Sequence, residues 1–168
     1  SEMCIRDREE LGGGEANDIW GWVDPVDSTE YVIMGRTNGT AFVNISDPLN
    51  PFLVADVPTE TTSSLWRDVK VYANHAFIVS EAGGHGMQVV DLTQLGGIPN
   101  PPVTLQPNAV YTGFGNAHNI VINPEIGRAY GVGTDTFAGG LHIVDISDPT
   151  NPVSYTHLRA HETELNRV

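Results

Sequence analysis

Polar residues stand in front of three short hydrophobic runs that are spaced almost evenly along the chain. Asn17-Asp18 precedes the first run, Arg67-Asp68 the second and His118-Asn119 the third. The offsets are 50 residues (68 minus 18) and 51 residues (119 minus 68). Carboxylates and an imidazole gathered at one place would contact a ligand or a cation, and an arginine would hold an anionic group. The candidate ligand-binding residues are therefore Asn17, Asp18, Arg67, Asp68, His118 and Asn119.

A structural role is the alternative for these polar residues. In a protein built from repeats, a side chain at the same position of each repeat can hydrogen-bond the neighbouring repeat and set the spacing between the two. Recurrence in every copy favours this interpretation over ligand binding.

The segment Glu81-Ala82-Gly83-Gly84-His85-Gly86 is the most unusual connection in the chain. Its three glycines allow positive φ angles and a close approach of the backbone to a ligand. Glu81 and His85 offer a general base or metal ligands, and with Asp68 and His118 they would complete a set for a divalent metal. The candidate catalytic residues are thus Asp68, Glu81, His85 and His118, and the candidate metal ligands are His85, His118 and Asp68. The alternative is a glycine-rich hairpin turn with two solvated polar side chains.

Other chemistry finds less support in the sequence. Trp20, Trp22 and Trp66 would stack on a sugar if they were exposed, and packing inside a core is the alternative. The chain has no Gly-x-Ser-x-Gly nucleophile elbow, no phosphate-binding loop and no dinucleotide fingerprint. The single cysteine, Cys4, lies in an irregular leader and is a poor nucleophile candidate.

A repeated strand pattern must position these residues. Residues 140–152 are a near-copy of residues 39–51, and residues 86–93 are a looser copy. A run of β-branched residues ended by Ser-Asp-Pro-x-Asn-Pro predicts a strand that runs into a tight turn. Two further strands precede each copy, the first beginning after the polar residues described above. A fourth strand is expected at residues 52–57 in the first repeat and, more weakly, at residues 103–105 in the second.

The third strand of each repeat is apolar on both faces. One face carries Met87, Val89, Leu141 and Ile143, and the other carries Val43, Ile45, Val90, Leu92, Val144 and Ile146. A strand of this kind needs cover on both sides. Four strands per repeat of about 50 residues is typical of a β-propeller blade, so we predict an all-β, β-propeller-type fragment of about three four-stranded antiparallel blades. A β-sandwich of a dozen short strands is the alternative.

The composition fits this fold class and excludes some partners. The 168 residues are 40% hydrophobic and include 18 glycines and 11 prolines, which favours many short strands joined by turns. The formal net charge is -13 and Lys70 is the only lysine, which argues against nucleic acid or an anionic membrane surface as a partner. No apolar run is long enough to insert into a membrane.

Several motifs together carry a resemblance to a known family. They are Trp20-Gly21-Trp22, Trp66-Arg67-Asp68-Val69-Lys70-Val71-Tyr72, Ser80-Glu81-Ala82-Gly83-Gly84-His85-Gly86-Met87-Gln88-Val89, Gly115-Asn116-Ala117-His118-Asn119-Ile120 and the Ile-Val-Asp-Ile-Ser-Asp-Pro copies. Between Asn17 and Pro152 the chain resembles the choice-of-anchor B proteins, which are bacterial β-propeller proteins of the LVIVP-repeat type. The resemblance implies an exported, extracellular or cell-surface protein, often with a C-terminal anchor, and it implies no settled catalytic activity.

The repeats divide the chain into expected segments. Residues 1–16 form a leader or linker, and residues 17–152 form the partial propeller, with blades at about 17–66, 67–117 and 118–152. Residues 153–168 look like a translated sequencing adaptor, so that the chain is expected to be a truncated fragment without a fourth strand in its last repeat. Three blades are fewer than the roughly four to eight that close a ring, so the first and last blades should expose a face.

We therefore predict a binding or interaction scaffold whose partner is a protein, a small molecule or a glycan. The alternative is a hydrolase or lyase with a metal or an acid/base pair at the channel mouth, drawn from the candidate catalytic residues.

Overall fold

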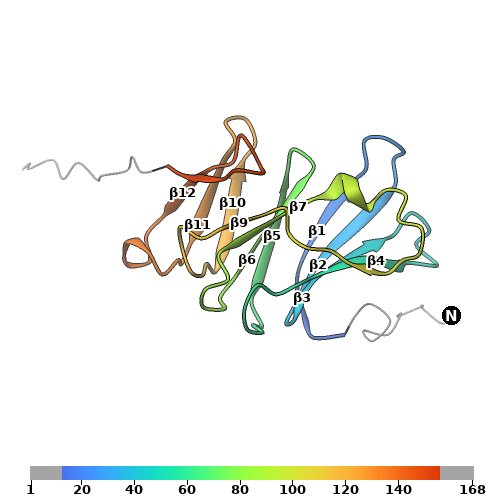
Figure 1. The fold of residues 1–168 in the computed structure, drawn as a ribbon, viewed down its shortest axis with the longest axis horizontal. Coiled ribbons are helices and arrows are strands. Elements are labelled where there is room, and N and C mark those ends of the chain that lie inside the picture. The colour runs from blue at the N-terminus through green and yellow to red at the C-terminus, as the bar shows by residue number, and fades with distance from the viewer. Residues whose placement is uncertain (1–12, 156–168) are drawn as a thin grey trace, which may run out of the picture.

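The computed structural model describes residues 13–155 and shows three separate β-sheets in a row (Figure 1). The first sheet has the order β1 (Ala16–Val23), β2 (Glu30–Arg36), β3 (Gly39–Asn44), β4 (Phe52–Pro58) and β8 (Val103–Thr104). The second has β5 (Arg67–Tyr72), β6 (His75–Ser80), β7 (Met87–Asp91) and β9 (Ala109–Tyr111). The third has β10 (Asn119–Asn123), β11 (Arg128–Val132), β12 (His142–Asp145) and β13 (Val153–Ser154). Two short 3-10 helices, η1 (Leu92–Leu95) and η2 (Phe137–Gly139), complete the described elements.

The sheets lie face to face, and their first strands, β1, β5 and β10, are neighbours in that order. We call these three the inner strands. One hydrophobic core lies between the first and second sheets, and a second core lies between the second and third. The all-β prediction is confirmed, and the three sheets replace the two packed sheets of the alternative sandwich.

The middle sheet is covered on both faces because its strands alternate between the two cores. In β6, Ile78 packs into the first core and Phe77 and Val79 into the second. In β7, Val90 belongs to the first core and Val89 to the second. The period of two residues along a strand gives each face its own apolar set, so the expected two-faced burial of this third strand is confirmed.

Two fourth strands differ from the sequence prediction. Val103–Thr104 was expected in the second repeat, but it pairs in parallel with β4 of the first sheet. Three apolar residues that flank this strand pack on the first core: Leu95, Ile98 and Leu105. Burial of their side chains favours pairing of the segment with the first sheet. The fourth strand of the second sheet is instead β9, which pairs antiparallel with β7.

The last repeat also has a fourth strand, where the sequence analysis expects none. The two-residue strand β13 pairs antiparallel with β12, with Val153 opposite Asp145 and Ser154 opposite Val144. Two residues carry no alternation from which a strand would be predicted. The part of the expected adaptor-like tail from residue 156 onward lies outside the described residues.

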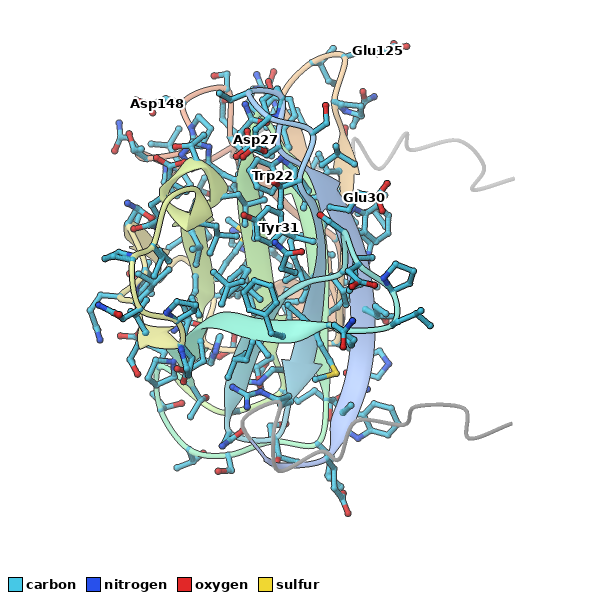
Figure 2. All side chains as sticks on the ribbon, turned by 90° about the vertical axis from the view of Figure 1, so that its right-hand side faces the viewer. Trp22, Asp27, Glu30, Tyr31, Glu125 and Asp148 are labelled. Atoms are coloured by element: carbon cyan, nitrogen blue, oxygen red, sulfur yellow. The ribbon has the colours of Figure 1, made fainter. Side chains whose placement is uncertain are left out.

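Hairpin connections at one end of the sheets carry acidic side chains. Figure 2 shows Asp27, Glu125 and Asp148 at this end, beyond the packed pair of Trp22 and Tyr31. The Trp22 and Tyr31 ring centroids are 5.4 Å apart, and both side chains are buried in the first core. The polar residues that precede β5 and β10 lie at the opposite end of the strands. Within residues 13–155, no helix is long and apolar enough to cross a membrane.

Candidate functional site

Two carboxylates join the inner strands of neighbouring sheets. The Asp18 Oδ2 atom accepts a hydrogen bond from the backbone N–H of Val69 at 2.9 Å. The Asp68 Oδ2 atom accepts the corresponding bond from the N–H of Ile120 at 2.7 Å. Asp18 and Asp68 occupy equivalent positions in β1 and β5, so the same side-chain bond links the first sheet to the second and the second to the third. These two residues therefore have a structural role, and ligand binding at these positions stays a prediction.

Asn17 and Asn119 take part in the same junctions. The Asn17 Oδ1 atom accepts a hydrogen bond from the backbone N–H of Arg67 at 2.9 Å. The Asn119 Nδ2 atom donates to Asp68 Oδ2 at 3.3 Å. Four of the six candidate ligand-binding residues thus come together along the inner strands, where they bond mainly to each other and to backbone.

Lys70 adds a positive charge to this group. Its Nζ atom forms an ion pair with Asp68 Oδ1 and lies 4.0 Å from Asp18 Oδ2. The same Nζ lies 4.7 Å from the centre of the Trp20 ring, a cation–π arrangement. We call Asp18, Trp20, Asp68, Lys70 and Asn119 the inner-strand cluster. The role of Lys70 was missed in the sequence, although its being the only lysine was a usable signal.

The two aspartates of the inner-strand cluster have different acidities. Burial, together with the hydrogen bond to the neighbouring Asp68 carboxyl, raises the pKa of Asp18. Burial alone would also raise the pKa of Asp68, but hydrogen bonds from Lys70 and from the Ile120 N–H lower it overall. Asp68 is therefore the ionised partner of Lys70, and Asp18 takes up a proton first as the pH falls.

The Arg67 side chain lies between the first and second sheets. Its guanidinium is buried between the first and second sheets, where Nε donates to the Arg36 carbonyl oxygen at 2.6 Å. Its Nη1 lies 2.8 Å from His85 Nε2, which must be the acceptor because a guanidinium has only donors. Alternation along β5 turns the Arg67 side chain away from Asp68, so these two candidate residues face different sheets, and a role for Arg67 in holding an anionic group stays a prediction.

His85 is buried with Arg67 and is not part of an open catalytic site. Its Nδ1 lies 3.1 Å from the Gly86 carbonyl oxygen, so the hydrogen bonds of both ring nitrogens assign a neutral ring protonated on Nδ1. Burial, with a smaller effect from the charge of Arg67, lowers the pKa of His85 to about 4. Gly84 and Gly86 do adopt the positive φ angles expected of this loop, at 76° and 64°.

Glu81 and His118 form the one pair of candidate catalytic residues that the structure brings together. The Glu81 Oε1 atom accepts a hydrogen bond from His118 Nδ1, and both side chains are exposed. The Trp66 ring, which is 51% exposed, lies 6.0 Å from the His118 ring, centroid to centroid. We call Trp66, Glu81 and His118 the Trp66 surface. It combines a half-exposed indole with a carboxylate and an imidazole.

The predicted metal set is not assembled. No group of three or more histidine, cysteine, aspartate or glutamate side chains within residues 13–155 is arranged to hold a metal ion. The reason is geometric: His85 faces the first sheet, Asp68 faces the third sheet beside Lys70, and His118 lies at the exposed loop end.

A shallow pocket lies elsewhere, in a place to which the sequence did not point. Its volume is about 420 Å³, and residues 109–113 and 150–154 line it, between β9 and the β12–β13 connection. Tyr111 belongs to this lining, but its hydroxyl is 2.7 Å from the buried His142 Nε2. The Tyr111 hydroxyl therefore already has a hydrogen-bond partner in the buried His142.

The comparison with known families identifies one repeat. A family model described as the LVIVD repeat matches residues 136–156, which contain β12, the following turn and β13. The matched segment includes the residues Leu141-His142-Ile143-Val144-Asp145, the last of the three copies found in the sequence. The match supports an LVIVD- or LVIVP-type repeat at this position. A search of the curated proteins finds no significant match to the chain.

Proposed function

We propose that the chain forms three blades of a β-propeller of the choice-of-anchor B type and acts as a binding scaffold. The observation that carries the proposal is the repeated junction in which Asp18 binds the Val69 N–H and Asp68 binds the Ile120 N–H. Carboxylates that hold sheets together are committed to structure, which favours a scaffold over a catalyst at the inner strands. The LVIVD match in the third sheet supports the propeller, because such repeats stack side by side.

The Trp66 surface is the proposed binding surface, with a glycan as the ligand class. A sugar ring has an apolar C–H face that would stack on the exposed indole, and hydroxyl groups that would bond to Glu81 and His118. The surface lies where the loops before β5 and β10 meet, and the two sheets on which it stands are packed together. Ligand binding therefore needs little rearrangement of the backbone.

A glycan array with the full chain tests this proposal. We expect saturable binding to a subset of oligosaccharides, and at least a tenfold loss of affinity for the Trp66→Ala variant. Phe52→Ala is the matched control, since Phe52 is an exposed aromatic residue at the opposite end of the strands. Binding that survives Trp66→Ala, or that falls equally in Phe52→Ala, would show that the Trp66 surface is not the site.

A hydrolase is the second candidate, and the Glu81–His118 pair is the observation that favours it. Glu81 holds Nδ1 of the imidazole, which leaves Nε2 as a base toward solvent, the arrangement of an oriented general base. Hydrolysis of p-nitrophenyl esters or glycosides that falls at least a hundredfold in both Glu81→Gln and His118→Gln would support an enzyme. Turnover unaffected by both changes would exclude this pair as its catalytic base.

We also propose that the protein is exported and displayed at a bacterial cell surface. The resemblance to choice-of-anchor B proteins and the net charge of -13 with a single lysine support this location. An antibody raised against the chain should label intact cells of the organism that encodes it. Labelling that needs lysis of the cells would contradict the proposal.

A further inference from the structure

Arg67 is an arginine that the fold buries almost completely. It begins β5, is 3% exposed, and packs its side chain between the first and second sheets. A Cβ added to Gly35 of β2 would lie 3.1 Å from the Arg67 Cβ, so the arginine lies directly on the first sheet at this glycine. Two residues farther along the same faces, Val69 and Ile33 belong to the first core. The guanidinium therefore lies beside an apolar layer, where solvent screens its charge little.

The hydrogen-bond partners of the Arg67 guanidinium are neutral. Its Nε donates to the Arg36 carbonyl oxygen at 2.6 Å, and its Nη1 donates to Nε2 of the neutral His85 ring at 2.8 Å. Its Nη2 is buried and has no hydrogen-bond partner among residues 13–155. The two N–H groups of Nη2 are thus buried donors without an acceptor in the described part of the chain, which is unfavourable.

The positive charge of Arg67 is also without a carboxylate partner within residues 13–155. Arg36 has its own ion pair with Asp56, at 3.9 Å. Arg128 pairs with Asp145 in the third sheet. Burial and, to a smaller extent, the charge of Arg36 lower the pKa of Arg67 to about 10, so the guanidinium is still protonated at neutral pH. Buried charges in proteins are paired, and this one therefore needs a counter-ion.

We infer that Arg67 binds a small monovalent inorganic anion of the halide class between the first and second sheets. The anion accepts the N–H groups of Nη2 and supplies the missing negative charge. Thr40 gives a further donor, since its hydroxyl is buried and has no hydrogen-bond partner among the described residues. Thr40 lies opposite Gly35 in the register of β2 and β3, so its side chain is on the face of the first sheet that Arg67 contacts. One negative charge balances one guanidinium, whereas a divalent anion would bury an excess charge at a larger dehydration cost.

Gln88 fixes the side of the guanidinium on which the anion lies. Its Nε2 donates to the Pro58 carbonyl oxygen at 3.0 Å and to Glu60 at 3.3 Å, across the same pair of sheets. Its Oε1 is a buried acceptor without a partner in the described part of the chain, and an amide oxygen repels an anion. The anion is therefore assigned to the side of Thr40. A water molecule is the competing occupant: it would accept from Nη2 but would leave the charge of Arg67 unbalanced.

The anion stabilises the contact between the first two sheets. It binds only where the sheets are packed, so it raises the stability of the folded chain by mass action. The Trp66 surface stands on the second and third sheets, and the inference does not depend on a ligand there. Salt also screens the net charge of -13, and a test must therefore hold the ionic strength fixed.

Thermal melts of the full chain in sodium chloride and in sodium gluconate, each at about 200 mM, measure the stabilisation. We define the chloride response as the Tm in chloride minus the Tm in gluconate, an anion too large for the interface. The response of the wild type should exceed that of Arg67→Met by about 5 °C, the shift expected for an ion at tens of times its Kd. Equal responses of the two proteins would overturn the inference.

Three substitutions separate the site from general effects of salt. Arg67→Met removes the charge and keeps the length of the side chain, a replacement that buried ion pairs commonly tolerate. Arg128→Met is the matched control and should keep the full chloride response, because Arg128 has its partner in Asp145. Thr40→Val removes one hydroxyl and should weaken chloride binding about tenfold. An undiminished response in Thr40→Val would contradict the position given to the anion.

Anomalous diffraction at the bromine edge, from crystals of the full chain grown in sodium bromide, locates the ion without any substitution. We expect an anomalous peak within hydrogen-bonding distance of Arg67 Nη2. Density at that place without anomalous signal would identify a water and overturn the anion. Neither result bears on glycan binding at the Trp66 surface, so the failure of one proposal is distinguishable from the failure of the other.

Discussion

Replacement of Asp68 by alanine tests the junction between the second and third sheets. The side chain is buried, its Oδ2 accepts the Ile120 N–H at 2.7 Å, and its Oδ1 pairs with Lys70. Asp68→Ala removes a charged hydrogen bond worth about 2 kcal/mol and leaves a buried N–H unpaired at a cost of at least about 1 kcal/mol. We expect the free energy of unfolding to fall by about 3 kcal/mol, which corresponds to roughly 10 °C in Tm for a chain of this size.

Urea unfolding followed by tryptophan fluorescence measures this loss, since Trp22 lies in the first core. All variants must be compared at one protein concentration, because self-association would couple stability to concentration. Asp27→Ala is the control: the Asp27 carboxylate accepts a hydrogen bond from Thr29 N within an exposed hairpin and joins no sheets. If Asp68→Ala is no more destabilising than Asp27→Ala, the argument that Asp68 holds two sheets together is refuted.

Three further predictions follow from burial and backbone geometry. The pKa of His85 is lowered to about 4 from 6.5, so only the unfolded state binds a proton between these pH values. The free energy of unfolding should therefore fall by up to about 3 kcal/mol as the pH drops through this window. Urea titrations at each pH measure this loss, and His85→Gln should flatten it. Gly86→Ala should abolish cooperative melting or lower Tm sharply, since Gly86 has a φ of 64° and an added Cβ would lie 2.3 Å from a carbonyl oxygen of β9. Gly83→Ala is the control and should melt like the wild type, because an added Cβ there would have no atom within 4 Å. Trp22→Ala should cost about 3 kcal/mol or more in urea unfolding because the indole is buried, and an equal cost for the half-exposed Trp66→Ala would contradict the assignment of Trp66 to a binding surface.

Strand patterns long enough to show a period could be read from the sequence. The repeated stretch that contains β7 and β12 was predicted as a strand that is apolar on both faces, and the division of Val89 and Val90 between two cores confirms this for the middle sheet. The strands β8 and β13 have two residues each and show no period, so their partners are set by tertiary packing. Pairing of Val103 with the first sheet depends on the packing of Leu95 and Ile98, which local sequence does not reveal.

The candidate site was predictable in its position and less so in its chemistry. The spacing of Asp18, Asp68 and Asn119 correctly placed them at equivalent points of the inner strands. It could not show that the side chains of Arg67 and Asp68 leave β5 on opposite faces toward different sheets, because no partner is visible in a single strand. For the same reason His85 was grouped with His118, although one is buried and the other exposed.

The central claim is that equivalent carboxylates join the inner strands of successive sheets. The most direct measurement is a long-range NMR experiment on deuterated chain that detects scalar coupling across hydrogen bonds. We predict couplings from the Val69 amide nitrogen to the Asp18 carboxyl carbon, and from the Ile120 amide nitrogen to the Asp68 carboxyl carbon. Absence of both, in a spectrum that shows the backbone couplings of β5 with β6, would contradict the claim.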